Sequence, residues 1–292
     1  MPRSDVAIVV NPIAGRGKAR ALAEQLKVEL SALGIRSDLL WTAGRGHALA
    51  LVRGEVSKGA GCIAVCGGDG TVNEVVNALA WSDVPLAILP GGRCNDLARA
   101  LRIPCSPRYV ANSIAKMQTL RIDLGRIGER AFATVATLGF DAEVSRIVSE
   151  EGMQIHGTPA YVVAALRLLA KYNFPHVRIE ADFWGFSGRI LLAATANTPA
   201  YGGGMMIAPM ANLMDGLLHM CLIKAAPKAT ILLLFPAVFF GWHRFHSAVS
   251  NHPITSVKVD SPQPLWLYAD GERIGATPTT IAVMPAALRV IV

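Results

Sequence analysis

The chain has 292 residues, of which 52% are hydrophobic and 17% are charged. This composition excludes an intrinsically disordered chain, which would be polar and highly charged, and the length predicts about two domains. The net charge of +7 suits phosphate-bearing ligands or an anionic membrane surface, but the basic residues are scattered singly, so we expect no nucleic-acid partner.

The first part of the chain repeats one pattern three times. A short apolar strand leads into a glycine-rich loop and then into a helix, with the strands at 6–10, 62–66 and 86–89. Continuous apolar strands that alternate with helices indicate a parallel sheet covered on both faces. Ligands bind outside the carboxyl ends of such strands. We therefore expect the three glycine loops to converge on one site.

The loop Gly67-Gly68-Asp69-Gly70-Thr71 is the most informative segment. Its glycines let backbone N–H groups approach phosphate oxygens closely. Thr71 and Glu74 have the spacing of a capping box, which predicts a helix N-terminus aimed at the anion. Asp69 would repel phosphate unless a cation lies between them, which indicates Mg²⁺. The P-loop pattern and the dinucleotide-binding fingerprint are both absent.

After residue 124 the pattern changes to strand-like runs separated by glycine and proline turns. These runs predict an antiparallel β-sandwich or barrel, and they lie at 131–138, 177–183, 190–196, 217–223, 254–259, 265–269, 279–283 and 288–292. One helix is expected to start at Thr158-Pro159 and to carry an apolar stripe as far as Leu169. We place an α/β domain at 1–124 and a β-sandwich domain at 125–292.

The most apolar segment lies at 231–242 and is interrupted by Pro236. It is well short of the roughly 20 residues that span a bilayer. Two interpretations stay open, a buried core helix or a patch that rests in a membrane interface. The five cysteines, an odd number, indicate reduced thiols and a cytoplasmic protein rather than a disulfide framework.

Glu272 follows Asp270-Gly271, which is a strong signal for a hairpin turn. A carboxylate at such a tip can reach into a cleft between domains. Phosphoryl transfer requires positioning, charge neutralisation and a group that accepts the proton of the attacking hydroxyl. The alternative for Glu272 is a solvated hairpin charge.

These motifs are part of a longer ordered set. The chain resembles the diacylglycerol-kinase catalytic family, which includes bacterial lipid kinases and the sphingosine and ceramide kinases. The resemblance covers nearly the whole chain and rests on Asn11-Pro12-x-x-Gly15, Trp41-Thr42, Gly46-His47-Ala48, Gly67 through Glu74, Leu89-Pro90-x-Gly92-x-x-Asn95-Asp96, Asp123-Leu124-Gly125, Gly139-Phe140-Asp141, Gly202-Gly203-Gly204, Ala208-Pro209, Asp215-Gly216-Leu217 and Asp270-Gly271-Glu272.

The resemblance implies an enzyme that uses ATP and Mg²⁺ to phosphorylate a lipid hydroxyl, of diacylglycerol or of a related glycerolipid or sphingolipid. It implies a nucleotide site in the cleft between the two domains, with Glu272 as general base. It places Asp69, Asp96 and Asp123 in the Mg²⁺ and active-site network. It implies nucleotide contacts at Asn11, Pro12, Gly15, Thr42, Gly67, Gly68, Asp69, Gly70, Thr71, Asn73, Gly92 and Arg93. It also implies a structural Mg²⁺ site at Asn212, Asp215 and the carbonyl of Leu217.

Arg93 departs from the family pattern, which has threonine at this position. An arginine could neutralise phosphate charge, or it could mark altered nucleotide handling. Arg93 therefore leaves open a catalytically inactive nucleotide-binding relative. A soluble-substrate kinase of the NAD-kinase type also stays open, because such kinases share Gly67-Gly68-Asp69-Gly70. A lipid acceptor predicts peripheral association with the membrane surface. The sequence leaves the oligomeric state open, a homodimer included.

Overall fold

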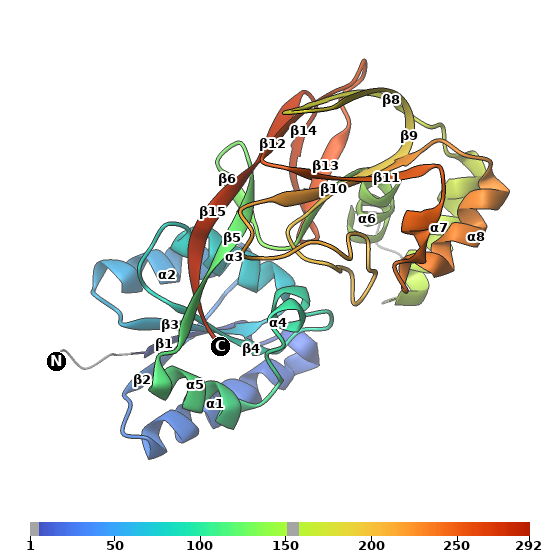
Figure 1. Cartoon of the computed structure of the whole chain (residues 1–292). Helices are drawn as coiled ribbons and strands as arrows, with labels where there is room; N and C mark the ends of the chain where they lie inside the picture. Colours follow the sequence, from blue (N-terminus) through green and yellow to red (C-terminus); the bar gives the residue numbers. More distant parts are fainter. Residues whose placement is uncertain (1–5, 151–157) are drawn as a thin grey trace.

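The computed structural model describes residues 6–150 and 158–292, and it consists of an α/β half and a β-sandwich half (Figure 1). In the first half, four strands form a parallel sheet in the order β2-β1-β3-β4. Their bounds are β1 (Val6–Val10), β2 (Ser37–Trp41), β3 (Cys62–Gly67) and β4 (Leu86–Pro90). The α/β fold with a parallel sheet is therefore confirmed.

Helices cover both faces of this sheet. The helix α1 packs beside α5, and α2 packs beside α3 on the other face (Figure 1). The bounds are α1 (Lys18–Ala32), α2 (His47–Ser57), α3 (Asp69–Leu79), α4 (Asp96–Ala100) and α5 (Pro107–Lys116), with the 3₁₀ helix η1 (Ala14–Gly17) before α1. The unit β2–α2 was not predicted, because β2 is an edge strand that is only partly buried and lacks a continuous apolar run.

Two long antiparallel strands, β5 (Thr119–Ile127) and β15 (Thr279–Ile291), run from one half to the other (Figure 1). The end of β15 lies parallel to β4 and buries Leu288, Val290 and Ile291 in the core of the first half. The division at residue 124 stays a prediction, and the structure adds that the chain returns to the first core at 288–291.

The second half is an antiparallel sandwich whose two sheets share the strand β9 (Gly185–Ala196). The first sheet also contains β6 (Arg130–Phe132), β5, β15, β12 (Ser256–Asp260) and β8 (His176–Ala181). The second contains β14 (Glu272–Ala276), β13 (Trp266–Ala269), β7 (Val135–Gly139), β10 (Leu218–Lys224) and β11 (Val249–Ile254). The predicted sandwich is confirmed.

Three helices, α6 (Phe140–Glu150), α7 (Thr158–Lys171) and α8 (Lys228–Val238), gather beside this second sheet (Figure 1). The 3₁₀ helix η2 (Trp242–Phe245) follows α8. Only Ile231 of α8 is fully buried, so the interpretation of 231–242 as a buried core helix is wrong. Within the residues that the structure describes, no helix combines the length and apolar character needed to cross a bilayer.

Candidate active site

The three glycine loops meet at the carboxyl ends of β1, β3 and β4. The N–H of Gly91 donates to the carbonyl of Gly67 at 3.0 Å. A Cβ atom on Gly15 would lie 2.3 Å from the carbonyl oxygen of Gly91, and one on Gly92 would lie 2.4 Å from the Cα of Gly68. The backbones therefore touch where a side chain would clash, and the expected convergence is confirmed.

The first loop is joined to the end of β3, and the second segment of the predicted site is joined to the end of β1. The N–H of Asn11 donates to the carbonyl of Cys66 at 3.0 Å, and Pro12 follows directly. The N–H of Thr42 donates to the carbonyl of Val10 at 2.8 Å, at the end of β1. Asn11, Pro12 and Thr42 therefore lie at the same edge of the sheet, at the carboxyl ends of its strands.

The start of α3 differs from the capping box that the sequence predicted. The helix begins two residues before Thr71, whose hydroxyl accepts a hydrogen bond from Asn11 Nδ2 at 3.2 Å. Glu74 does not cap its own helix: its carboxylate accepts the N–H groups of Gly46 at 2.7 Å and Ala48 at 2.9 Å. The capping-box prediction is wrong because Glu74 lies in the second turn, facing the start of α2.

Asp69 and Asp96 are linked, because each carboxylate accepts two backbone N–H groups and Asp69 accepts the N–H of Asp96. Asp69 accepts the N–H of Asn95 at 3.0 Å and that of Asp96 at 2.7 Å. Asp96 accepts the N–H groups of Gly202 at 2.7 Å and Gly203 at 3.0 Å, which connects the two halves. Burial, and then the negative charge of Asp69, raise the pKa of the Asp96 carboxyl.

A divalent cation fits this pair chemically. Two neighbouring carboxylates supply oxygen ligands of the type that Mg²⁺ prefers, and a bound cation would offset the repulsion between their negative charges. No cluster of three or more His, Cys, Asp or Glu side chains suited to a metal exists among the described residues. A cation at Asp69 and Asp96 would therefore depend on further oxygens from water or from phosphate.

Asp270 is a site residue that the sequence marked as part of a turn and of the Asp270-Gly271-Glu272 motif, without a role of its own. Its carboxylate accepts Asn73 Nδ2 at 2.6 Å, the N–H of Ala133 at 2.8 Å, the N–H of Thr134 at 2.9 Å and the Thr134 hydroxyl at 2.5 Å. Burial raises the pKa of this carboxyl. Asp270 thus fixes the tip of the β13–β14 hairpin against α3, and the predicted hairpin turn is confirmed. Asn73, which was predicted as a nucleotide contact, is held by its hydrogen bond to Asp270.

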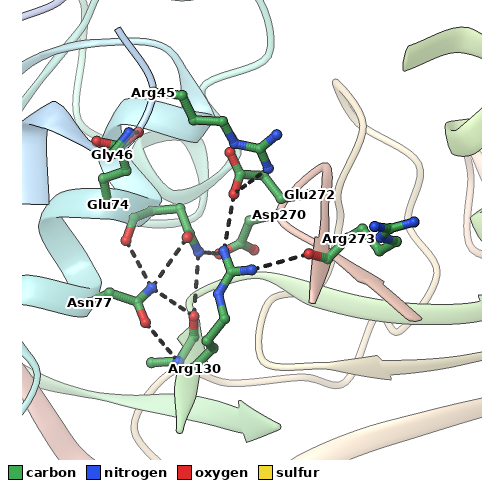
Figure 2. A network of polar contacts seen from close by, with 10 residues as sticks. Arg45, Gly46, Glu74, Asn77, Arg130, Asp270, Glu272 and Arg273 are labelled. Atoms are coloured by element: carbon green, nitrogen blue, oxygen red, sulfur yellow. Dashed lines mark hydrogen bonds and ion pairs between the residues drawn. The ribbon is translucent and has the colours of Figure 1, made fainter. Parts of the chain in front are cut away.

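Glu272 lies at the hairpin tip between two arginines (Figure 2). Its carboxylate contacts the guanidinium groups of Arg45 and Arg130, each at 3.1 Å. A Cβ atom on Gly70 would lie 3.7 Å from Glu272 Oε1, so the carboxylate is beside the start of α3. The side chain is only 17% exposed, which makes the solvated-charge interpretation wrong. Arg45 and Arg130 carried no motif that could have revealed them.

Asp123 lies apart from the glycine loops. Its buried carboxylate accepts the N–H of Gly216 at 2.7 Å and the N–H of Ala286 at 2.7 Å. Ala286 stands where the register of β15 against β5 is interrupted. Asp123 therefore joins the 212–217 loop to β15, and it does not line the cavity described below.

The 212–217 loop holds the residues predicted for a structural Mg²⁺. Asn212 Oδ1 accepts the N–H of Met214 at 3.1 Å, and Asp215 Oδ1 accepts the N–H of Leu217 at 3.0 Å. Asp215 Oδ2 lies 3.3 Å from His219 Nε2. These bonds are local turns, and the structural Mg²⁺ site predicted at Asn212, Asp215 and the carbonyl of Leu217 stays a prediction. Amide, carboxylate and carbonyl oxygens are of the type that Mg²⁺ accepts.

One cavity of about 380 Å³ connects the glycine loops with the interior of the second half. Its polar end is lined by Asp69, Arg93, Asp96 and Asp270. Its other end lies among α6, α7, α8 and the second sheet, and its apolar lining includes Val144, Ala165, Leu191, Ile231, Leu234 and Val238.

Asp141 is a further acidic residue in the lining of the cavity. Burial raises the pKa of its carboxyl, and hydrogen bonds with Thr137 and Tyr201 oppose this shift. The sequence placed Asp141 in a motif without a role, because nothing local indicates which side chains surround it.

Both halves of the chain match known protein families. Residues 5–127 match the diacylglycerol kinase catalytic domain, and residues 134–292 match the YegS C-terminal NAD kinase beta sandwich-like domain. A diacylglycerol kinase of Mycobacterium tuberculosis is 33% identical, over 98% of this chain and 94% of that protein. The chain belongs to the diacylglycerol kinase family. The family expected from the sequence motifs is confirmed.

Other members of this lipid kinase family support the same placement. A "probable lipid kinase YegS-like" protein of Pseudomonas aeruginosa is 31% identical, over 84% of this chain and 81% of that protein. The crystal structure of a diacylglycerol kinase from Bacillus anthracis matches with a TM-score of 0.77 at 22% identity, over 100% of this chain and 97% of that chain. The structural match shows that the family fold extends over both halves.

Proposed function

We propose that this diacylglycerol kinase family member transfers the γ-phosphate of ATP, with Mg²⁺, to a hydroxyl of diacylglycerol or of a related glycerolipid or sphingolipid. The observation that carries the proposal is the single cavity that leads from Asp69 at the glycine loops to an apolar interior. A phosphate donor fits the loop end, where backbone N–H groups gather. An acyl chain fits the apolar end, where water-soluble acceptors would gain nothing.

In this proposal the glycine loops at Asn11 to Gly15, Gly67 to Thr71 and Gly92 bind the nucleotide, with Thr42 at their edge and Asn73 behind them. Asp69 and Asp96 would hold Mg²⁺, which neutralises phosphate charge when it is bound. Arg93 lines the polar end of the cavity and adds positive charge there.

Glu272 would accept the proton of the attacking lipid hydroxyl. Its place beside the start of α3 puts a carboxylate next to the phosphate loops, where a general base for this reaction is needed. Arg45 and Arg130 orient that carboxylate. We assign Asp123 a positioning role in this network, and we retain Asn212, Asp215 and Leu217 as a structural Mg²⁺ site.

Two alternatives receive less support. A soluble substrate of the NAD-kinase type would leave the apolar end of the cavity without a function. An inactive relative would not need Glu272 and Asp69 to be held at the loops, and both are. We also propose that the protein works in the cytoplasm and associates peripherally with the membrane, where a lipid acceptor resides.

The test is phosphate transfer from labelled ATP with Mg²⁺ to lipids in mixed micelles. The panel contains diacylglycerol, monoacylglycerol, sphingosine, ceramide and phosphatidylglycerol, with NAD as a soluble acceptor. One labelled lipid that is lost in Asp69→Ala supports the proposal and names the acceptor. Labelling of NAD alone, or ATP binding without transfer to any acceptor, would contradict it.

A further inference from the structure

The segment around α8 exposes an unusual number of large apolar side chains. Leu233 is 79% exposed and Trp242 is 66% exposed. Together with Leu232, Phe240 and Phe245, which are also exposed, they form what we call the α8 patch. Large exposed apolar patches on a folded protein mark interaction surfaces.

The sequence of α8 explains this exposure. The helix is apolar on every side, yet Ile231 is its only fully buried residue. A helix that is apolar all round is normally buried or in contact with lipid. Here the second sheet covers one side only, so the opposite side requires another apolar environment.

The patch is continuous with the cavity. Phe235 and Phe239 line the cavity and are also 37% and 41% exposed. Their rings contact each other edge to face, with centroids 6.2 Å apart. These two rings therefore form the boundary between the apolar interior of the cavity and the outside of the protein at α8.

The charged side chains of α8 and η2 are basic. The segment 227–246, which contains both helices, includes Lys228 and Arg244 but no aspartate or glutamate. Lys228 donates to the carbonyl of Ala170 at 2.7 Å, which ties the start of α8 to α7. The guanidinium of Arg244 lies 4.7 Å from the ring centre of Phe245. Basic side chains beside exposed aromatic rings complement anionic lipid headgroups.

We propose that the α8 patch docks the protein on an anionic bilayer surface, with Phe235 and Phe239 facing the acyl chains. In this orientation a lipid chain passes from the bilayer into the cavity without crossing water. The route rests on the proposed function, whereas the docking itself does not. Aromatic residues such as Trp242 and Phe240 are well suited to the membrane–water interface.

The first experiment measures cosedimentation with phosphatidylcholine vesicles, with and without phosphatidylglycerol, in the absence of nucleotide. The double variant Leu233→Glu/Trp242→Glu should bind the anionic vesicles at least about tenfold more weakly than the wild type, because each substitution places a negative charge in the membrane interface. Phe183→Glu is the matched control, since Phe183 is 99% exposed but lies in the β8–β9 turn. Equal binding of the double variant and the wild type would overturn the proposal.

A second measurement is independent of charged substitutions. Vesicles that carry bromine on their acyl chains should quench the tryptophan fluorescence of the wild type, and Trp242→Phe should remove most of that quenching. Undiminished quenching in Trp242→Phe would contradict docking through α8. A second copy of the chain is the competing occupant: a wild-type dimer that becomes monomeric in the double variant, with vesicle binding unchanged, would also overturn the proposal.

Transfer in mixed micelles separates this inference from the proposed function. If the double variant phosphorylates micellar lipid normally but loses activity on vesicles, both are supported. If the wild type binds vesicles through α8 but phosphorylates no lipid, the docking stands and the proposed function fails. If lipid is phosphorylated and the double variant is as active on vesicles as the wild type, the docking fails alone.

Discussion

The side chain of Asn73 on α3 donates a 2.6 Å hydrogen bond to the carboxylate of Asp270, 197 positions later in the chain. Asp270 also accepts three hydrogen bonds from Ala133 and Thr134. The bond therefore joins the first half to the hairpin that carries Glu272. We expect this bond to help set the distance between Glu272 and the glycine loops.

Asn73→Ala should lower stability and turnover together. The substitution removes one partner of a partly buried carboxylate, and such losses cost about 1–3 kcal/mol. Urea unfolding measures the free energy of unfolding. The kcat for lipid phosphorylation tests whether Glu272 keeps its place beside the glycine loops. Asn251→Ala, at an exposed asparagine of β11, is the matched control. Unchanged kcat in a folded Asn73→Ala protein would mean that the hairpin is held by other contacts.

Glu272→Gln should lower kcat by about 10²-fold or more, because general-base contributions are of that size, while ATP affinity stays near normal. Arg45→Ala and Arg130→Ala should lower kcat with little loss of stability, since exposed ion pairs contribute about 1 kcal/mol at most. Glu180→Gln, which loses an exposed ion pair with Arg178, serves as the control. Full activity of Glu272→Gln would exclude the general-base role.

Asp141→Asn should stabilise the protein near neutral pH. Burial raises the pKa of Asp141 above its ordinary value of 3.8, so the folded state favours the protonated form. The stability associated with this group is present below pH 3.8 and is lost as the pH rises through the raised pKa. The variant's gain in Tm should therefore be largest at pH 7 and shrink toward pH 4, measured against Asp38→Asn. A lower Tm than the wild type at pH 7 would contradict this.

Ala165→Phe should select against long acyl chains. Ala165 is buried on α7 and lines the apolar end of the cavity, so a phenyl ring there occupies space needed by the chain. We expect transfer to a long-chain acceptor to fall about tenfold or more, in line with the cost of overpacking, with ATP binding unchanged. Ala170→Phe places the same ring on the exposed side of α7. Equal losses for short-chain and long-chain acceptors would argue against this use of the cavity.

The sequence predicted the first half well where strands are buried on both faces. The runs at 6–10, 62–66 and 86–89 are continuous apolar segments because helices cover both sides of them. The edge strand β2 has no such run and was missed. The same limit applies to α8, whose apolar sequence does not show which side meets the protein and which side is exposed.

Site residues were predicted where a local motif marked them, and missed where their role comes from distant contacts. Asp69 stands in a glycine loop that signals phosphate binding by itself. Arg45 and Arg130 have significance only because the hairpin brings Glu272 to them. Asp123 was predicted from a motif, yet its carboxylate binds backbone N–H groups of residues 93 and 163 positions away. No local pattern contains that information.

The path of β15 has a consequence for protein synthesis. Leu288, Val290 and Ile291 complete the core of the first half, beside β4. Residues 6–116 emerge from the ribosome long before these positions are synthesised. We expect the α/β half to remain incomplete until the last strand emerges, so the two halves should reach their final structures together rather than one after the other.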